Sequence, residues 1–426
     1  MAQNTDKKLR NMMMYQIFVR NFSAQGTFAA VRPQLERIKE LGTDIIWFMP
    51  IHPIGTLQRK GTLGSPYAIS DYRAVNPEFG TLDDFKELVD DIHAHGMKCM
   101  IDVVYNHTSP DSKLSREHPE WFYHREDGSF GNRVGDWTDI IDLDYSAKEL
   151  WDYQIETLCF WAEIVDGFRC DVAPLIPIEF WERARAEVAK VRPDCIWLSE
   201  SVEPGFITYM RGRGITALSD SEIYRAFDIS YEYDCYGAMR AYIEGRGSLE
   251  TYAEAVNMQE YIYPDNYVKL RFLENHDQTR AAFLIPDSLS LLNYTAFMFF
   301  RKGMTLVYAG QENSVTHLPS LFDRDTVDFT SGADISGVIR RLADIKKDGI
   351  FTDSTFTVRA VSDSFLSAVY KKDGRSALGV FSLKAQSACV RVDFPDGVYK
   401  NLIDDTEVEV FRGCVSCTGK PIIIIR

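Results

Sequence analysis

One pattern recurs eight times between residues 12 and 310: a short apolar segment, a turn, and a helix with one apolar face. Such a series of strand and helix units favours a parallel sheet, and eight units favour a closed (β/α)8 TIM barrel over an open sheet. We therefore expect an α/β fold built on a barrel. The expected strands are 14–19, 44–49, 98–104, 167–170, 195–199, 226–230, 268–273 and 304–308.

The segment 81–93 illustrates the helical part of the pattern. Thr81 is a candidate N-cap, because its hydroxyl is able to accept a hydrogen bond from the first helical turn. Apolar residues follow at spacings of three and four, which places them on one face of a helix. They are Leu82, Phe85, Leu88, Val89 and Ile92.

The chain divides into two predicted domains. Residues 1–350 form the barrel, including a small inserted region at 108–146 that makes an irregular excursion after the third strand. After residue 350 the apolar residues alternate with a period of two, and turns such as 372–374 separate the runs. The expected strands of this part are 356–361, 365–370, 376–381, 388–394, 407–411 and 421–426. Residues 351–426 are therefore predicted to be an antiparallel β-sandwich domain.

Charge and composition narrow the class of partner. Asp and Glu number 62 against 47 Lys and Arg, a net charge of -15, which argues against nucleic acid and anionic membranes. The first ten residues lack the apolar core of a secretory signal, and the longest apolar run is too short to cross a bilayer. We expect a cytoplasmic protein with reduced cysteines that handles a neutral ligand.

The segment 167–171, Gly-Phe-Arg-Cys-Asp, carries the first candidate chemistry. Arg169 and Asp171 lie two positions apart near a strand end, so they share one face. We expect the guanidinium to keep Asp171 ionised, which suits a nucleophile. A buried structural ion pair remains an alternative interpretation of these two residues.

Further polar residues stand at other strand ends, where TIM barrels carry their active sites. These are His107, Glu200, His276 and Asp277. Individually, Glu200 is also explained as an anion at a helix N-terminus, Asp277 as an N-cap, and each His as a core imidazole. Jointly with Asp171 they predict acid, base and nucleophilic chemistry at one site.

These segments resemble the four signature regions of the α-amylase family of glycoside hydrolases (family 13), in order and in approximate spacing. The regions are 102–107 (Asp-Val-Val-Tyr-Asn-His), 167–171, Glu200 at a strand end, and 275–277 (Asn-His-Asp). The resemblance extends to Tyr15-Gln-Ile-Phe, to 64–72 and to 305–312, and it covers roughly residues 12 to 350.

The resemblance implies a retaining mechanism. Asp171 would attack the anomeric carbon, Glu200 would act first as the acid and then as the base, and Asp277 would hold ring hydroxyls in the transition state. The implied substrate-binding residues are Tyr67, which would stack on the sugar, together with His107, Arg169 and His276. Asp102 is expected to be interior and to bond Arg169 rather than to act in catalysis.

Calcium is the one cofactor that the resemblance brings into question. Many calcium-dependent amylases carry a Lys-His pair where this chain has Pro174 and Leu175, so we assign no metal and no cofactor. Oxygen ligands for a calcium ion would nevertheless be available in this region. They are Asn106, Asp136, Asp139, Asp142 and Asp144.

The expected activity is the retaining hydrolysis of α-1,4-glucosidic linkages in maltooligosaccharides and other α-glucans through a covalent glycosyl-enzyme. One alternative is a glucanotransferase or sugar phosphorylase that uses the same site with a different acceptor. A second is a non-catalytic sugar-binding homologue, which the presence of all three acids disfavours. Oligomeric state and chain-length preference are not predicted.

Overall fold

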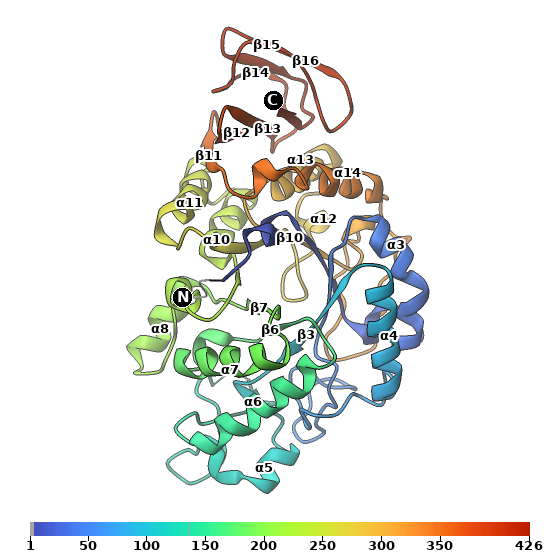
Figure 1. The fold of residues 1–426 in the computed structure, drawn as a ribbon, viewed down its shortest axis with the longest axis vertical. Helices are drawn as coiled ribbons and strands as arrows, with labels where there is room; N and C mark the ends of the chain where they lie inside the picture. The colour runs from blue at the N-terminus through green and yellow to red at the C-terminus, as the bar shows by residue number, and fades with distance from the viewer. Residues whose placement is uncertain (1–3, 136) are drawn as a thin grey trace.

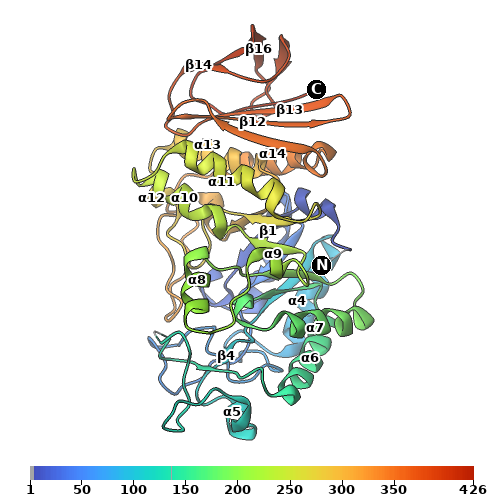
Figure 2. The same ribbon diagram turned by 90° about the vertical axis from the view of Figure 1, so that its left-hand side faces the viewer.

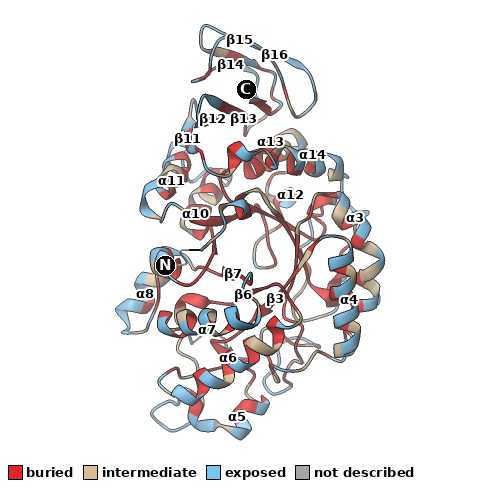
Figure 3. Ribbon diagram, viewed as in Figure 1, coloured by how far each residue is buried: buried red, intermediate tan, exposed pale blue. Residues whose placement is uncertain are grey.

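The computed structural model describes residues 4–135 and 137–426. Eight parallel strands close into a barrel in the order β1-β10-β9-β8-β7-β6-β3-β2 (Figure 1). The strands are β1 (Met13–Ile17), β2 (Ile45–Phe48), β3 (Lys98–Val103), β6 (Gly167–Cys170), β7 (Ile196–Ser199), β8 (Ile229–Tyr231), β9 (Val268–Arg271) and β10 (Met304–Tyr308). Both faces of these strands are covered, so nearly every barrel residue is buried (Figure 3). The predicted TIM barrel is confirmed.

Helices surround the barrel and turn their apolar faces to it. α4 (Leu82–Ala94) begins at Thr81 with a capping box shared with Asp84, and Phe85, Leu88, Val89 and Ile92 are buried as the stripe predicted. The other α-helices are α1 (Val19–Phe22), α2 (Phe28–Val31), α3 (Leu35–Glu40), α5 (Lys113–Glu117), α6 (Lys148–Ala162), α7 (Ile178–Val191), α8 (Pro204–Gly212), α9 (Asp220–Ile223), α10 (Tyr233–Ile243), α11 (Leu249–Ile262), α12 (Ala281–Leu284), α13 (Ser288–Phe300) and α14 (Ser336–Lys346). Short 3-10 helices are η1 (Lys7–Asn11), η2 (Arg32–Gln34), η3 (Pro119–Trp121), η4 (Ala173–Leu175), η5 (Gln311–Asn313) and η6 (Gly349–Phe351).

The region after β3 is a small insertion at one end of the barrel. It contains α5, η3 and a two-stranded antiparallel sheet of β4 (His107–Thr108) and β5 (Ile141–Asp142). In Figure 2 this region lies at the end of the molecule opposite the C-terminal sheets. The sheet places His107 beside Asp142, so this insertion supplies one of the predicted site residues.

Two antiparallel four-stranded sheets make up the C-terminal part, and the sequence predicted such a domain. One has the order β11-β12-β13-β18, and the other has the order β14-β17-β16-β15. The strands are β11 (Thr355–Ala360), β12 (Phe365–Lys372), β13 (Arg375–Ser382), β14 (Ala388–Arg391), β15 (Gly397–Lys400), β16 (Glu407–Phe411), β17 (Cys414–Cys417) and β18 (Ile422–Ile425). The first sheet lies on α11 and α13 (Figure 2). The division between residues 350 and 351 stays a prediction.

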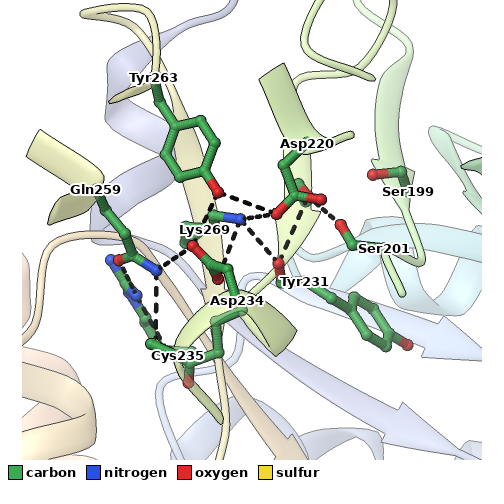
Figure 4. A network of polar contacts seen from close by, with 12 residues as sticks. Ser199, Ser201, Asp220, Tyr231, Asp234, Cys235, Gln259, Tyr263 and Lys269 are labelled. Carbon is green, nitrogen blue, oxygen red and sulfur yellow. Dashed lines mark hydrogen bonds and ion pairs between the residues drawn. The ribbon is translucent and has the colours of Figure 1, made fainter. Parts of the chain in front are cut away.

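A buried charged network fixes the outer side of β8 and β9 against the helices (Figure 4). The Lys269 ammonium contacts Asp220 and lies 3.3 Å from Asp234, and Tyr263 donates hydrogen bonds to both carboxylates. Ser201 is hydrogen-bonded to Asp220. Buried charges are tolerated when they are paired in this way, and this pairing reaches the residue that follows Glu200.

Among the residues that the structure describes, no helix has both the length and the apolar character needed to span a membrane.

Candidate active site

The predicted site residues meet in one cavity of about 450 Å³ at the C-terminal ends of the barrel strands. Six of the seven line it: Tyr67, His107, Asp171, Glu200, His276 and Asp277. The seventh, Arg169, is fully buried and makes ion pairs with two of the lining carboxylates. The sequence positions these groups through parallel strands, because strand ends that are distant in the chain meet at one barrel rim.

Arg169 connects three acids. Its Nη1 atom donates to Asp102 at 2.9 Å and to Asp171 at 2.9 Å, while its Nη2 atom lies 3.0 Å from Glu200 Oε1. The pairing of β3 with β6 explains the first contact, because it sets Asp102 directly beside Arg169. Asp102 is fully buried under the site, so the expectation that it is interior and bonds Arg169 agrees with the structure.

Burial controls the protonation of Asp171 and Glu200, which both face the cavity. It raises the pKa of Asp171 to about 7, although Arg169 acts in the opposite direction. Burial also raises the pKa of Glu200 to about 8; Arg169 opposes this rise, and the Asp171 charge adds to it. The expectation that Arg169 keeps Asp171 ionised was therefore wrong. Desolvation raises the pKa of Asp171 by more than the Arg169 guanidinium lowers it.

A left-handed backbone at Val172 links the two acids. Val172 has φ of 35°, a conformation that a β-branched residue adopts only under strain. The strained turn directs its N–H to Glu200 Oε2 at 2.8 Å. Asp171 itself is held by its own N–H, which donates to Val103 O at 2.9 Å. The backbone after β6 thus positions both carboxyl groups.

A chain of hydrogen bonds orders the opposite wall of the cavity. Tyr67 donates its hydroxyl proton to Asp102 at 3.1 Å and lies 2.6 Å from His276 Nε2. Because the Tyr67 proton points to Asp102, the Tyr67 oxygen accepts a hydrogen bond from His276 Nε2. The other ring nitrogen of His276, Nδ1, accepts a hydrogen bond from the Gln16 amide at 2.7 Å. Burial lowers the pKa of His276 to about 4, so the ring is neutral at pH 7.

Asp277 is the most exposed of the three acids predicted from the sequence, with 38% of its side chain accessible. Its Oδ2 lies 3.1 Å from His276 Nε2, and its N–H donates to Asn275 Oδ1 at 2.9 Å. The carboxylate is therefore held in place and still open to the cavity. Such a group is suited to accept hydrogen bonds from hydroxyls of a ligand.

His107 reaches the cavity from β4. Its Nε2 lies 4.0 Å from Asp171 Oδ2, and its ring lies 5.7 Å from the ring of Trp137. Burial lowers the pKa of His107 to about 4, which leaves a neutral imidazole able to donate a hydrogen bond without adding charge.

Several lining residues were not predicted from the sequence. Tyr233 and Gln278 follow strands β8 and β9, so strand-end position was a signal that could have found them. Val202 and Glu203 follow β7 and carry the same signal, Phe206 lies in the first turn of α8, and Lys60 and Phe322 lie on loops whose sequences carry no comparable signal. Trp137, which also lines the cavity, lies in the inserted region.

The proposed calcium ligands have other partners. Asp139 lies 2.8 Å from the Lys60 ammonium, and the Asn106 amide contacts His107 Nδ1 at 3.2 Å. Asp136 lies outside the described residues. Within the described ranges, no cluster of three or more His, Cys, Asp or Glu side chains could hold a metal ion.

The Arg133 side chain supplies a positive charge next to the candidate calcium ligands. Arg133 lies 3.6 Å from Asp142 and 3.8 Å from Asp144, and it donates to the Leu143 carbonyl at 3.1 Å. Its guanidinium thus contacts the oxygens that would surround a calcium ion, so this donor set does not fit one. The lack of a calcium requirement remains a prediction.

We expect EDTA to change the melting temperature of the protein by less than about 1 °C, because Arg133 supplies the positive charge of this region. Arg133→Ala should lower it by about 2–4 °C, as Asp142 is buried and loses its cation. Arg125→Ala, in an exposed turn of the same insertion, is the control. Differential scanning calorimetry measures these melting temperatures. A large fall in melting temperature with EDTA that added calcium reverses would contradict this prediction.

Comparison with known proteins assigns the family. The model for the alpha amylase catalytic domain matches residues 4–126 and 111–350, and the model for the bacterial alpha amylase C-terminal domain matches residues 357–424. A solved alpha-amylase from Lactobacillus plantarum is 47% identical, with a TM-score of 0.96 over 99% of this chain and 100% of that one. The noncanonic maltogenic alpha-amylase AmyB from Thermotoga neapolitana is 34% identical, with a TM-score of 0.88 over 98% of this chain and 99% of that one.

Curated relatives include an alpha-1,4-glucan:maltose-1-phosphate maltosyltransferase from Rhodospirillum rubrum, 33% identical over 295 residues. The match covers 64% of this chain and 39% of that protein, so the chain spans well under half the length of this relative. The family model and the solved structures, in contrast, extend over nearly the whole chain. The chain therefore belongs to the alpha-amylase family.

Proposed function

We propose that the protein is a retaining glycoside hydrolase that cleaves α-1,4-glucosidic linkages in maltooligosaccharides. The observation that carries the proposal is the convergence of Asp171, Glu200 and Asp277 on one cavity. Asp171 and Glu200 contact different nitrogens of the same Arg169 guanidinium. This arrangement favours the short separation of a retaining pair, about 5–5.5 Å, over the wider spacing of an inverting pair.

In the first step, Asp171 attacks the anomeric carbon while Glu200 gives its proton to the glycosidic oxygen, and the bond between that carbon and oxygen breaks. The products are a glycosyl ester on Asp171 and a free sugar hydroxyl. In the second step, Glu200 takes a proton from water, the water oxygen attacks the same carbon, and the ester bond breaks. Asp171 and Glu200 thereby return to their starting states.

The surrounding residues lower the barrier to these steps. The raised pKa of Glu200 keeps it protonated near neutral pH, as an acid requires. Neutral His107 donates a hydrogen bond to a sugar hydroxyl, and Tyr67, which His276 holds in place, offers an aromatic face to the ring. Asp277 binds hydroxyls whose positions change as the ring flattens, which favours the transition state over the ground state.

The acceptor distinguishes this proposal from its main alternative, transfer to a sugar or to phosphate. The maltosyltransferases among the relatives are named for a donor that carries phosphate, whereas the solved neighbours are named as amylases. After Glu200, Val202 and Glu203 lead into α8, and Glu203 is the N-cap of that helix. Its carboxylate would repel a phosphate at this helix N-terminus, so the site favours water or a sugar hydroxyl as the acceptor.

Digestion of maltoheptaose followed by product chromatography tests the proposal. We expect shorter maltooligosaccharides at the same rate with and without inorganic phosphate, and no glycosyl phosphate. Proton NMR of the first product should show the α-anomer, as retention requires. Sugar phosphates would indicate a phosphorylase, and products longer than the substrate without net hydrolysis would indicate a glucanotransferase.

A further inference from the structure

One segment of the cavity rim, residues 55–64 in the loop after β2, is held rigidly by its neighbours. Leu63 donates its N–H to the Phe322 carbonyl at 2.9 Å, and Thr62 donates its N–H and hydroxyl to Asp323 Oδ1 at 2.9 and 2.7 Å. At the other end, Thr56 donates its N–H to Asp111 Oδ2 at 2.9 Å. The segment is thus tied to the loop after β10 and to the insertion after β3.

An ion pair joins this segment to the inserted region at the cavity rim. Lys60 Nζ lies 2.8 Å from Asp139 Oδ1, and both residues line the cavity. Asp139 belongs to the inserted region and has 7% of its side chain exposed, against 37% for Lys60. A pair with one buried partner persists more than a fully exposed pair, because the buried carboxylate has few alternative partners.

The order of strands places the loops that carry this ion pair on a different part of the rim from Glu200. Around the barrel the strands run β10, β1, β2, β3 on one side, and β7 lies four positions from β1. Phe322, Lys60 and Asp139 follow β10, β2 and β3, so their loops cover the arc centred on β1 and β2. Glu200 follows β7, which lies opposite β1, three positions from β2 and two from β3.

The direction of a bound sugar chain follows from the chemistry of the proposed function, on which this inference rests. Glu200 protonates the oxygen of the departing sugar, so the leaving part of the chain lies on the side of β7. The glycone, which becomes bonded to Asp171, extends the other way, toward Lys60 and Asp139.

We propose that the Lys60–Asp139 ion pair closes the glycone end of the cavity and makes the enzyme act from the non-reducing ends of its substrates. A closed end accepts only a short glycone, of one or two glucose units, and excludes an interior segment of a long glucan. The cavity volume of about 450 Å³ suits this role, because pockets of about 300–1,000 Å³ enclose single small ligands. Lys60 is thus a specificity-determining residue.

The test compares maltoheptaose with a maltoheptaose whose non-reducing terminal glucose carries a 4,6-O-ethylidene block. We expect the unmodified enzyme to cleave the blocked chain on the order of 100-fold more slowly, because the blocked end does not fit a closed pocket. In Lys60→Ala, the ratio of blocked to free cleavage should rise about five- to tenfold, since loss of the ion pair opens the end. Lys60→Arg should retain the low ratio.

Lys190→Ala is the matched control, because Lys190 forms an exposed ion pair with Glu187 on α7 and does not line the cavity. Its ratio should equal that of the unmodified enzyme. Equal cleavage of both substrates by the unmodified enzyme, or an unchanged ratio in Lys60→Ala, would overturn this inference and leave hydrolysis standing. Cleavage of neither substrate would overturn the proposed function itself.

Discussion

Asp171→Asn is expected to reduce kcat on maltooligosaccharides by about four orders of magnitude or more. An amide is a far weaker nucleophile than a carboxylate, and without the covalent bond to the sugar the remaining groups catalyse little. Sugar binding should persist, because the amide has nearly the same shape and Arg169 keeps Asp102 and Glu200 as partners. Steady-state kinetics measures the first effect, and calorimetric titration with maltotriose measures the second.

The matched control for this change lies at the other end of the same strand. Asp166 is also buried and precedes β6, where it accepts a hydrogen bond from the Cys99 N–H outside the cavity. Asp166→Asn should leave kcat within a few-fold of the unmodified enzyme, whatever it does to stability. If Asp171→Asn retained kcat within tenfold, Asp171 would not be the nucleophile.

Glu200→Gln should lower kcat/KM by about 10²–10⁴-fold, which is the usual contribution of a general acid. Because the pKa of Glu200 is raised to about 8, its protonated fraction and hence the rate should fall as pH rises through that value. The Gln variant cannot lose this proton, so its remaining activity should lack the alkaline decline. A pH profile of kcat/KM from pH 5 to 10 measures both effects.

A better leaving group isolates the acid step. With a 2,4-dinitrophenyl maltoside, which departs without protonation, the loss in Glu200→Gln should shrink for the first step. Glu203→Gln is the comparison, since Glu203 is the other glutamate that lines the cavity and it should keep the alkaline decline. An alkaline decline that survives in Glu200→Gln would assign the titration to another group.

Much of the barrel could be predicted from the local sequence. The predicted strands 167–170 and 304–308 have the observed bounds of β6 and β10, because each is a compact apolar run between clear turns. The strand expected at 226–230 begins only at Ile229, since Ala226 and Phe227 are buried by packing outside the sheet. An apolar run in a sequence indicates that its residues are buried. It does not show that they form a strand, because a strand also needs a neighbouring strand as its hydrogen-bonding partner.

The second C-terminal sheet shows the same limit. β15 and β17 were not predicted, because β15 is largely exposed and β17 is a short run, Cys-Val-Ser-Cys, with only one strongly apolar residue. An exposed strand at a sheet edge has only a weak apolar alternation. β12 and β13 were predicted because their inward faces are strongly apolar.

The site divides in a similar way. Groups at strand ends, such as Asp171, Glu200 and Asp277, were predictable because barrel geometry determines where strand ends meet. Lys60 and Phe322 were not, because their loops reach the cavity only through long-range contacts. The protonation of Asp171 was misjudged because it depends on burial, a property of the whole fold.

The single guanidinium of Arg169 has a consequence for combined mutants. Three acids draw on one positive charge, so neutralising any one of them leaves more of that charge to the remaining two and makes them harder to protonate. Double mutants among Asp102, Asp171 and Glu200 should therefore depart strongly from the sum of their single effects.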